Sequence, residues 1–196
     1  MKSGIIILSE LTGDVRERVL EIQRRFDPKL AAGVPPHVTI TGSSGMGPIS
    51  TLTTEEELRR ALEPVARETE PMTLHFKRPI RFMQTNVVVL PLNPNGPIRA
   101  LHERIKTSGL RFEAPRFTFT PHVTLSFFRE LTPDEARALL ALRVTEPVTI
   151  DHISAHRTVD ITNSKKLLEL ALGDAGVRNP PVRKAASSNR GVRRGR

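Results

Sequence analysis

The chain has 196 residues, with 30 Lys and Arg against 21 Asp and Glu, which gives a formal net charge of +9. It contains no Cys, Tyr or Trp, and this excludes a disulfide framework, a thiolate zinc site and a cysteine or tyrosine nucleophile. Its apolar runs are much shorter than the roughly 20 residues of a membrane span, and its first residues lack the apolar core of a secretion signal. We therefore expect a soluble, cytoplasmic protein of one domain.

The first third of the chain predicts a strand, a helix and a second strand. Apolar residues recur at helical spacing from Asp14 to Phe26, and Asp27-Pro28 is typical of a helix end. Pro35 and Pro36 force an extended chain into a β-branched segment. The expected elements are a strand at 4–9, a helix at 14–26, a strand at 37–40 and a loop at 42–48.

The middle of the chain predicts a helix, three short strands and another helix. Thr54 with Glu57 three residues later is a capping box, which marks a helix start. The cluster of Pro, Asn and Gly at 93–97 is typical of a turn, and Gly109 is typical of a helix end. The expected elements are helices at about 55–68 and 98–107 and strands at 72–76, 79–82 and 86–90.

The last third predicts an extended segment, a helix and closing strands. Thr132 and Glu135 repeat the capping pattern, with Pro133 in the first turn. The expected elements are an extended segment at 117–127, a helix to about 142 and strands at 147–155 and 166–172. This irregular mixture favours an α+β fold with mainly antiparallel sheets. The glycine-rich patterns of dinucleotide and P-loop sites are missing from the sequence.

The positive charge is concentrated at the C-terminal end. Residues 177–196 carry seven basic and no acidic residues, whereas residues 1–176 carry 23 basic and 21 acidic residues. Such a polar segment buries too little apolar surface to offset its ordering entropy. We expect a folded region at 1–172 and a basic, disordered tail at 173–196. The tail is either an electrostatic arm for RNA or a solubilising terminus.

A five-residue unit occurs twice. Pro36-His37-Val38-Thr39-Ile40 recurs as Pro121-His122-Val123-Thr124-Leu125, each followed by a loop and a capped helix. In a strand, residues two apart share a face, so each His shares a face with its Thr while the aliphatic residues point to a core. The repeat predicts two similar halves. Side by side, the two strands would direct two imidazoles and two hydroxyls at one phosphate.

Two histidines suit phosphodiester chemistry near neutral pH. The ordinary pKa of a histidine is about 6.5, so one ring can be neutral while the other is charged. The neutral ring removes a proton from water, and the charged ring protonates the departing ribose oxygen. This chemistry needs no metal. A single copy of the pattern would be an ordinary strand with polar outward residues, but two copies in the same local order favour a shared site.

At these residues the chain resembles the two-histidine (2H) phosphoesterases, in the branch named for bacterial 2′-5′ RNA ligase and RNA 2′,3′-cyclic phosphodiesterase. The hallmark is a pair of His-x-Thr/Ser-x motifs, here 37–40 and 122–125. The resemblance covers about residues 1–172. It implies a bilobal, pseudo-symmetric α+β fold, with two mainly antiparallel sheets flanked by helices around a central cleft.

The resemblance also implies a function. His37 would be the proton donor and His122 the proton acceptor, and Thr39 and Thr124 would bind the phosphate. The substrate would be RNA or a nucleotide with a 2′,3′-cyclic phosphate, hydrolysed to a 2′-phosphate, with reversible 2′-5′ ligation at the same site. We expect no metal, cofactor or membrane partner, and a monomer. Close bacterial members often have Arg where this chain has Phe127. Because the chain has no Tyr or Trp, any base stacking must come from Phe, for example Phe127, Phe128 or Phe82.

Two alternatives remain open. One is a 2H-fold module that binds RNA or nucleotide without catalysis, and the other is a 2H enzyme for a small non-RNA cyclic phosphate such as ADP-ribose 1″,2″-cyclic phosphate. Substrate choice would lie in the loops at 42–48 and 93–97. The other histidines are interpreted as structural: His75 and His102 as surface residues, and His152 and His156 as strand residues rather than a metal pair.

Overall fold

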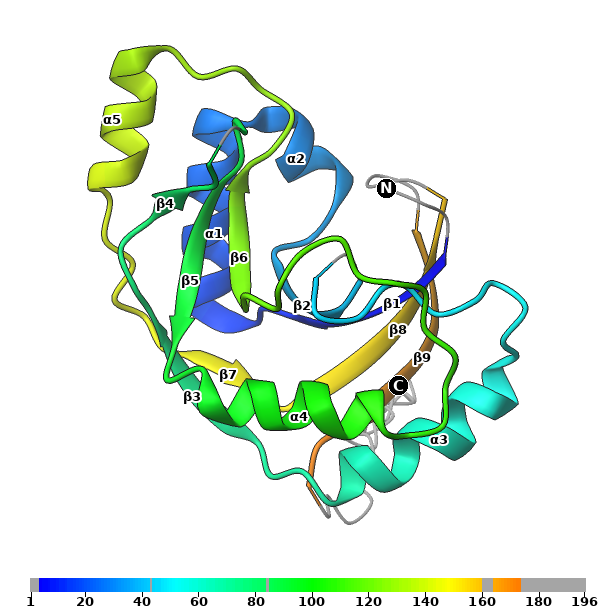
Figure 1. The fold of residues 1–196 in the computed structure, drawn as a ribbon. Coiled ribbons are helices and arrows are strands. Elements are labelled where there is room, and N and C mark those ends of the chain that lie inside the picture. Colours follow the sequence, from blue (N-terminus) through cyan, green and yellow to red (C-terminus); the bar gives the residue numbers. More distant parts are fainter. Residues whose placement is uncertain (1–3, 43, 84, 160–163, 174–196) are drawn as a thin grey trace, which may run out of the picture.

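The computed structural model describes residues 4–42, 44–83, 85–159 and 164–173. Helices and strands alternate along the chain as the sequence predicts (Figure 1). The helices are α1 (Gly13–Phe26), α2 (Pro28–Gly33), α3 (Glu55–Arg67), α4 (Gly96–Lys106) and α5 (Pro133–Ala141). The strands are β1 (Gly4–Glu10), β2 (His37–Thr41), β3 (Met72–Phe76), β4 (Ile80–Arg81), β5 (Val88–Asn93), β6 (His122–Ser126), β7 (Val148–Ile150), β8 (His152–Thr158) and β9 (Ser164–Ala171).

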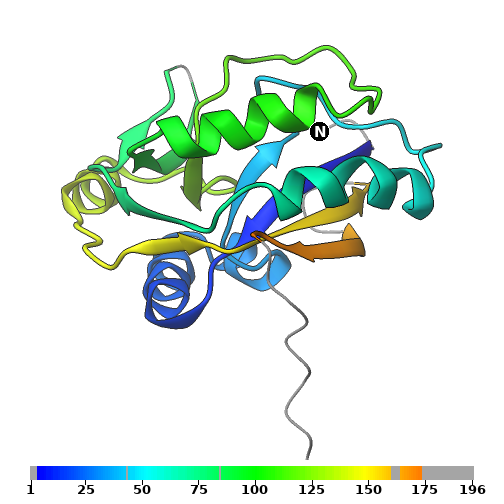
Figure 2. The same cartoon turned by 90° about the horizontal axis from the view of Figure 1, so that it is seen from below.

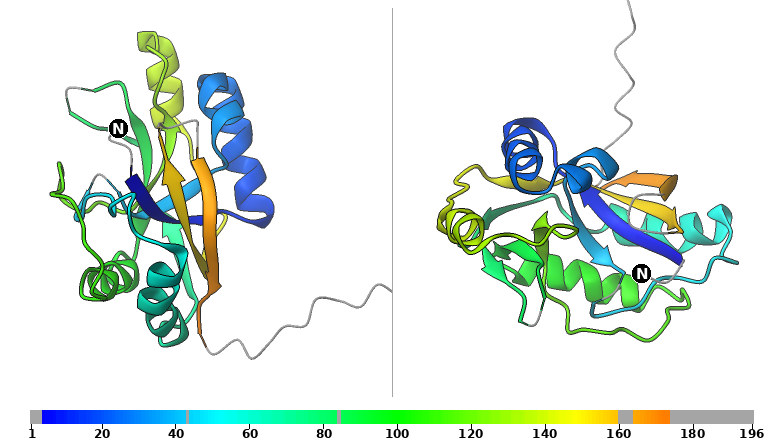
Figure 3. Two further views of the ribbon diagram at one scale, coloured as in Figure 1. Left: turned by 90° about the vertical axis from the view of Figure 1, so that its right-hand side faces the viewer. Right: turned by 90° about the horizontal axis from the view of Figure 1, so that it is seen from above.

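The strands form two sheets, and each pair of neighbouring strands within a sheet is antiparallel. The first sheet has the order β2-β1-β8-β9, and the second has the order β4-β5-β3-β7 with β6 also paired to β5. Helices α1 and α2 lie on one side of the strands and α3 and α4 on the other (Figures 2 and 3). This arrangement confirms the predicted α+β class with two antiparallel sheets flanked by helices.

One buried hydrophobic cluster runs through both sheets. It contains Val38 and Ile40 of β2 as well as Val123 and Leu125 of β6, all with no exposed surface. Both motif strands therefore bury their aliphatic residues in a common core, as the alternation within each motif predicts. The core fixes the backbone of the two motif strands relative to each other.

The two capping boxes are confirmed, and each starts a helix that follows a motif strand. The Thr54 hydroxyl accepts from the Glu57 amide at the start of α3, and the Glu57 carboxylate accepts in return from the Thr54 amide. Thr132 and Glu135 make the same pair of hydrogen bonds at the start of α5. Reciprocal caps of this kind satisfy two amides that a helix start otherwise leaves without partners.

The prediction of one strand at 147–155 is wrong. Strand β7 pairs with β3 in the second sheet, whereas β8 pairs with β1 and β9 in the first sheet, and Asp151 lies between them. The alternation of apolar and polar residues changes phase at Asp151 and His152, which are two polar residues in a row, but a change of phase does not show which strand pairs on either side. This segment is one of the links that hold the two sheets together.

Helix α2 is not among the elements predicted from the sequence. The pair Asp27-Pro28 ends one helix, as predicted, but it also starts another, because Asp is a good N-cap and Pro suits the first helical turn. The Asp27 carboxylate accepts from the Leu30 amide at 3.1 Å and caps α2. The short helix then leads into the extended segment before β2.

The two halves of the chain match in register as well as in element order. In the β1–β2 pair, Ile7 is opposite Thr41 and Leu8 is opposite Thr39, with a bulge between these positions. The β5–β6 pair repeats this pattern, because Val88 is opposite Ser126, Val89 is opposite Thr124, and a bulge lies at the same place. The pseudo-symmetry predicted from the repeated motif therefore extends to individual strand partners.

Two further predictions concern membrane-spanning segments and the tail. Among the described residues, no helix is both long and apolar enough to cross a membrane. The predicted tail at 173–196 lies outside the described residues, apart from Gly173. The amide of Gly173 donates to the Ala66 carbonyl at 3.0 Å, so β9 ends against α3.

Candidate active site

Strands β2 and β6 present the motif residues in the same way. His37 and Thr39 lie on one face of β2 and are partly exposed, and His122 and Thr124 lie on one face of β6 with the same burial. Strands β2 and β6 also pack beside each other. A charge on His37 lowers the pKa of His122. The fold brings the four predicted site residues together.

Each motif histidine is fixed by the carbonyl two residues earlier. Nδ1 of His37 donates to the Pro35 carbonyl at 2.8 Å, and Nδ1 of His122 donates to the Thr120 carbonyl at 2.5 Å. A carbonyl oxygen only accepts, so the neutral ring carries its proton on Nδ1 and Nε2 is the basic nitrogen. The two rings therefore have the same tautomer and the same local support.

Burial lowers the pKa of both motif histidines below its ordinary value. Their carbonyl partners act in the opposite direction and raise the pKa. The charged surroundings then differ, because Glu10 raises the pKa of His37 and no carboxylate is among the groups that act on His122. The site is symmetric in its backbone but not in its electrostatics.

Each motif strand is also held by a helix from the other half of the chain. On α1, Gln23 donates through Nε2 to the Thr124 carbonyl of β6 at 2.8 Å. On α4, His102 donates through Nδ1 to the Ile40 carbonyl of β2 at 2.7 Å. These two crossed contacts tie the backbone of each motif to the half that carries the other one.

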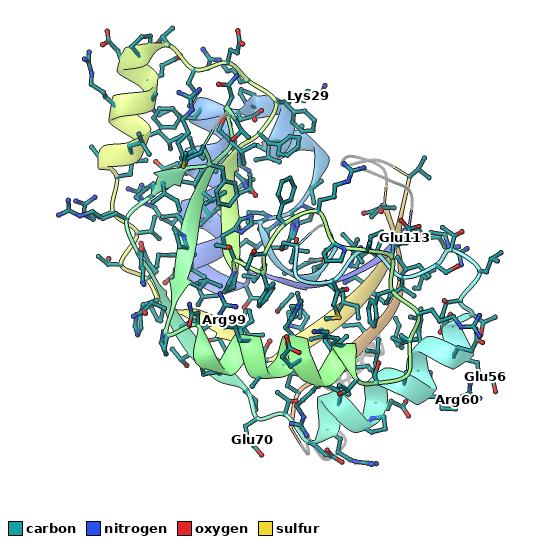
Figure 4. The ribbon with its side chains drawn as sticks, viewed as in Figure 1. Lys29, Glu56, Arg60, Glu70, Arg99 and Glu113 are labelled. Atoms are coloured by element: carbon teal, nitrogen blue, oxygen red, sulfur yellow. The ribbon has the colours of Figure 1, made fainter. Side chains whose placement is uncertain are left out.

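The prediction that His102 lies on the surface is wrong. Its side chain is buried, stacks on Phe119 with 3.8 Å between the ring centroids, and has a pKa lowered by that burial. Arg99 extends from α4 toward the same segment (Figure 4), where it donates to the Phe119 carbonyl at 2.8 Å. The polar neighbours Glu103 and Arg104 suggested an exposed helix position, but a helix covered by a loop buries more than its apolar face.

The loop that follows β2 packs against the segment that precedes β6. The Gly45 amide donates to the Phe117 carbonyl at 2.8 Å, and the Gly47 amide donates to the Glu113 carbonyl at 3.0 Å. Gly45 has a positive φ of 70°, and a Cβ there would lie 2.4 Å from Nε2 of His102. The sequence analysis predicted this loop as a determinant of substrate choice. The structure shows that its backbone is closely held.

The segment after β6 differs from the family pattern in a defined way. The amides of Phe127 and Phe128 both donate to one oxygen of the buried Asp27 carboxylate, each at 2.7 Å. The nearby Arg129 is in an ion pair with Glu135 at 2.6 Å. Arg129 is therefore engaged at the start of α5. The side chain of Phe127 is 40% exposed.

A hollow of about 290 Å³ lies at the end of β4 and the connection to β5. Its lining residues are Arg81, Phe82, Met83, Thr85 and Asn86. The Phe82 ring meets the His122 ring edge to face, with 5.2 Å between the centroids. Of the three phenylalanines considered for base stacking, Phe82 is therefore the one in contact with a motif histidine.

The sequence analysis missed a polar cluster next to His37. Ser154 is opposite Leu8, which is opposite Thr39, so Ser154 and His156 of β8 lie on the same sheet face as the first motif. The Ser154 hydroxyl and Nε2 of His156 are 3.0 Å apart, and both side chains are buried. The register of the first sheet is the only signal that places these residues here, and it is not visible in the sequence.

The remaining histidine predictions are mostly upheld. His75 is exposed on β3, as expected. His152 and His156 lie on strand β8, also as expected, and His152 bonds the Asp151 carboxylate at 2.7 Å. Within the described part of the chain, no group of three or more His, Cys, Asp or Glu side chains is arranged to hold a metal ion.

Two curated relatives cover most of the chain. A Bacillus pumilus (strain SAFR-032) protein, provisionally named a phosphoesterase, is 29% identical over 137 residues, which is 69% of this chain and 74% of its own. A Geobacillus thermodenitrificans (strain NG80-2) protein with the same provisional name is 27% identical over 163 residues, or 82% of this chain and 84% of its own. The similarity therefore extends over most of this chain and most of each relative.

Solved structures share the fold at low identity. The Thermus thermophilus protein TT0787 has a TM-score of 0.63 and 18% identity, covering 87% of this chain and 98% of its own. Escherichia coli LigT in its apo form has a TM-score of 0.57 and 17% identity, with the same coverage. LigT has also been crystallised with 3′-AMP and with ATP.

A family model of the 2′-5′ RNA ligase superfamily matches residues 12–161, which include both motifs and the helices and strands between them. This match agrees with the paired histidine motifs and with the fold shared with LigT. The chain belongs to the 2′-5′ RNA ligase superfamily of two-histidine phosphoesterases.

Proposed function

We propose that this protein is a cyclic phosphodiesterase that hydrolyses 2′,3′-cyclic phosphates on RNA or nucleotides to 2′-phosphates. The observation that carries this proposal is the matched pair of motif histidines. They lie on adjacent strands, and each is held through Nδ1 so that Nε2 is free to exchange a proton with substrate. Two imidazoles so placed supply the two proton transfers that the hydrolysis requires.

In the proposed reaction, neutral His122 acts as the base and charged His37 as the acid. Nε2 of His122 removes a proton from water as the water oxygen attacks phosphorus. The bond from phosphorus to O3′ breaks, and His37 donates its proton to O3′, which leaves a 2′-phosphate and a free 3′-hydroxyl. His37 is then neutral and His122 charged, and proton exchange with solvent restores the starting state.

In this proposal the two motif threonines hold the phosphate. Thr39 and Thr124 share a strand face with their histidines and are partly exposed, so their hydroxyls are available to the same ligand. A hydroxyl that donates to an anionic oxygen makes a hydrogen bond stronger than one between neutral groups. The threonines would donate to the two non-bridging oxygens while the histidines flank the attacking and leaving oxygens.

The hollow lined by Phe82 supports a nucleoside substrate. The Phe82 ring contacts the His122 ring. The hollow is also lined by the exposed Met83 side chain and by Arg81 and Asn86, which hydrogen-bond to each other. A base is planar with polar edges, and aromatic stacking on a base is tolerant of base identity. The nucleotides bound to LigT are consistent with such a substrate. With an RNA 5′-hydroxyl in place of water, the same groups would form a 2′-5′ bond.

The test is product formation from nucleoside 2′,3′-cyclic phosphates in excess EDTA. Wild type is compared with His37→Ala and His122→Ala, and His75→Ala is the matched control because His75 is an exposed histidine on β3. Each motif variant is expected to lose about 10²- to 10⁴-fold in kcat, with its thermal unfolding unchanged. The control is expected to retain full activity.

The possible outcomes separate the alternatives. A 2′-phosphate product that both motif variants fail to make would support the proposal. Turnover that stops in EDTA would overturn the metal-free mechanism. If wild type makes no product from any nucleotide, the function is wrong as stated, and ADP-ribose 1″,2″-cyclic phosphate and RNA binding without turnover become the next two assays.

A further inference from the structure

We infer that Glu10 is the positioning residue that assigns the acid role to His37, and so breaks the symmetry of the two-histidine site. The inference rests on the proposed function, because it concerns which histidine carries the proton in that reaction. The motif itself is symmetric, with the same residues, the same carbonyl contacts and the same strand register in both halves. The difference between the two histidines must therefore come from neighbouring side chains.

Strand pairing places Glu10 beside His37. Glu10 of β1 is directly opposite His37 of β2, so the two side chains leave the sheet on the same face. Directly opposite residues have Cβ atoms about 4.5–5.5 Å apart. The equivalent residue in the second half is Pro91 of β5, which is directly opposite His122. One histidine thus has a carboxylate across the ladder, and the other has an uncharged proline.

Side chains of β8 and β9 contact the Glu10 carboxylate. Its Oε1 atom is 3.5 Å from Nζ of Lys166 on β9 and 3.9 Å from Nε2 of His156 on β8. The Glu10 side chain is 29% exposed, so solvent screens this group less than a fully exposed one. The contact with Lys166 and the pairing of β1 limit where that carboxylate can lie.

The other titratable groups around Glu10 do not replace it. Glu169 is in an ion pair with Lys166 at 2.6 Å, one strand further from His37 than β8. His152 is bonded to Asp151, and burial lowers the pKa of His156. Among the described residues, Glu10 is the carboxylate that raises the pKa of His37, and no carboxylate acts on the pKa of His122.

Ser154, His156 and Glu10 do not form a catalytic triad. In a serine hydrolase the base contacts the serine through one ring nitrogen and the acid through the other. Here Ser154 and Glu10 both approach Nε2 of His156. His156 therefore does not relay a proton between them. Its place between Ser154 and Glu10 fits a residue that holds the carboxylate, rather than one that reacts.

The test compares Glu10→Gln with Glu169→Gln. Both changes remove a carboxylate near Lys166, but only Glu10 is opposite His37. The Glu10 carboxylate stabilises the charged form of His37, so its loss should move the basic limb of the kcat/KM profile to lower pH. At pH 8 we expect kcat/KM to fall about three- to tenfold, while the value on the acidic side of the optimum stays near wild type. Glu169→Gln should leave the limb in place.

A second readout does not depend on turnover. The ring protons of His37 and His122 are titrated by NMR in the substrate-free protein, with the two alanine variants used for assignment. Glu10→Gln should lower the pKa of His37 and leave that of His122 nearly unchanged. An unmoved His37 titration, or a loss of activity that is equal at every pH, would overturn the inference. If the titration moves but no cyclic phosphate is hydrolysed, the proposed function fails and the role of Glu10 in protonation stands.

Discussion

The β1–β2 pair and the β5–β6 pair have nearly the same backbone but different surroundings. Both pairs share a register, a bulge and a histidine fixed by the carbonyl two residues earlier. In the first pair the histidine is opposite Glu10, and in the second it is opposite Pro91 and contacts Phe82. Backbone symmetry therefore sets where the two imidazoles lie, and the neighbouring side chains give each imidazole a different environment.

The threonines offer the strongest test of the shared part of the comparison. Thr39→Val and Thr124→Val remove equivalent hydroxyls and nearly keep the side-chain volume. Each should lower kcat/KM by about 10- to 100-fold, because a hydrogen bond to a charged group is worth about 1.5–3 kcal/mol. Steady-state kinetics on a nucleoside 2′,3′-cyclic phosphate measures this loss. Thr73→Val, on an exposed strand position of β3, is the control. A tenfold difference between the two motif variants would show that the halves do not share the phosphate equally.

The hollow tests a feature that only the second half has. Phe82→Ala should raise KM for a nucleoside 2′,3′-cyclic phosphate by about tenfold, since stacking on one base is worth about 1–3 kcal/mol. A ribose 2′,3′-cyclic phosphate without a base should be insensitive to the change, which makes it the matched control. Phe128→Ala is the comparison variant, because it removes a different aromatic ring, which packs against Lys29 and Phe127. If Phe128→Ala has the larger effect, the base lies by that ring and not in the hollow.

The pH profile tests the two histidines together. Burial lowers the pKa of both below the ordinary 6.5, so the form with one charged and one neutral ring is most populated on the acidic side of that value. We expect kcat/KM to be bell-shaped and to fall as pH rises above about 6.5. The two limbs report the pair rather than single residues. A profile that is flat from pH 5 to 9 would be incompatible with the proposed roles.

The smallest expected effect concerns stability and the crossed helix contacts. His102 is buried with a lowered pKa, so the unfolded chain binds its proton more readily than the folded chain. The contribution of His102 to stability is present above its unfolded pKa and is lost as pH falls toward its folded pKa. Denaturant unfolding between pH 7 and pH 5 should show a smaller loss of stability in His102→Asn, which keeps a donor for the Ile40 carbonyl but does not titrate. An equal loss in both proteins would assign the acid sensitivity to other groups.

Much of the fold and the core of the site could be predicted from the sequence, because the signals are local. Helix starts at Thr54 and Thr132 follow from capping boxes, and the motif strands follow from their β-branched residues. The repeated motif predicted matched halves, which the register confirms. It also predicted that His37, Thr39, His122 and Thr124 lie together, and the structure places them on adjacent strands.

What the sequence could not show depends on which segments become neighbours. The change of sheet at Asp151, the burial of His102 and the position of Glu10 opposite His37 all come from pairing between distant segments. A strand pattern repeats every two residues whatever its partner, so it fixes which side chains share a face but not what lies across the ladder. By itself the sequence determined the family, the repeat of the histidine motif and most of the order of elements. Only the tertiary structure decided that the two chemically identical motifs have different neighbours, because register and packing set the charge and the shape around each histidine.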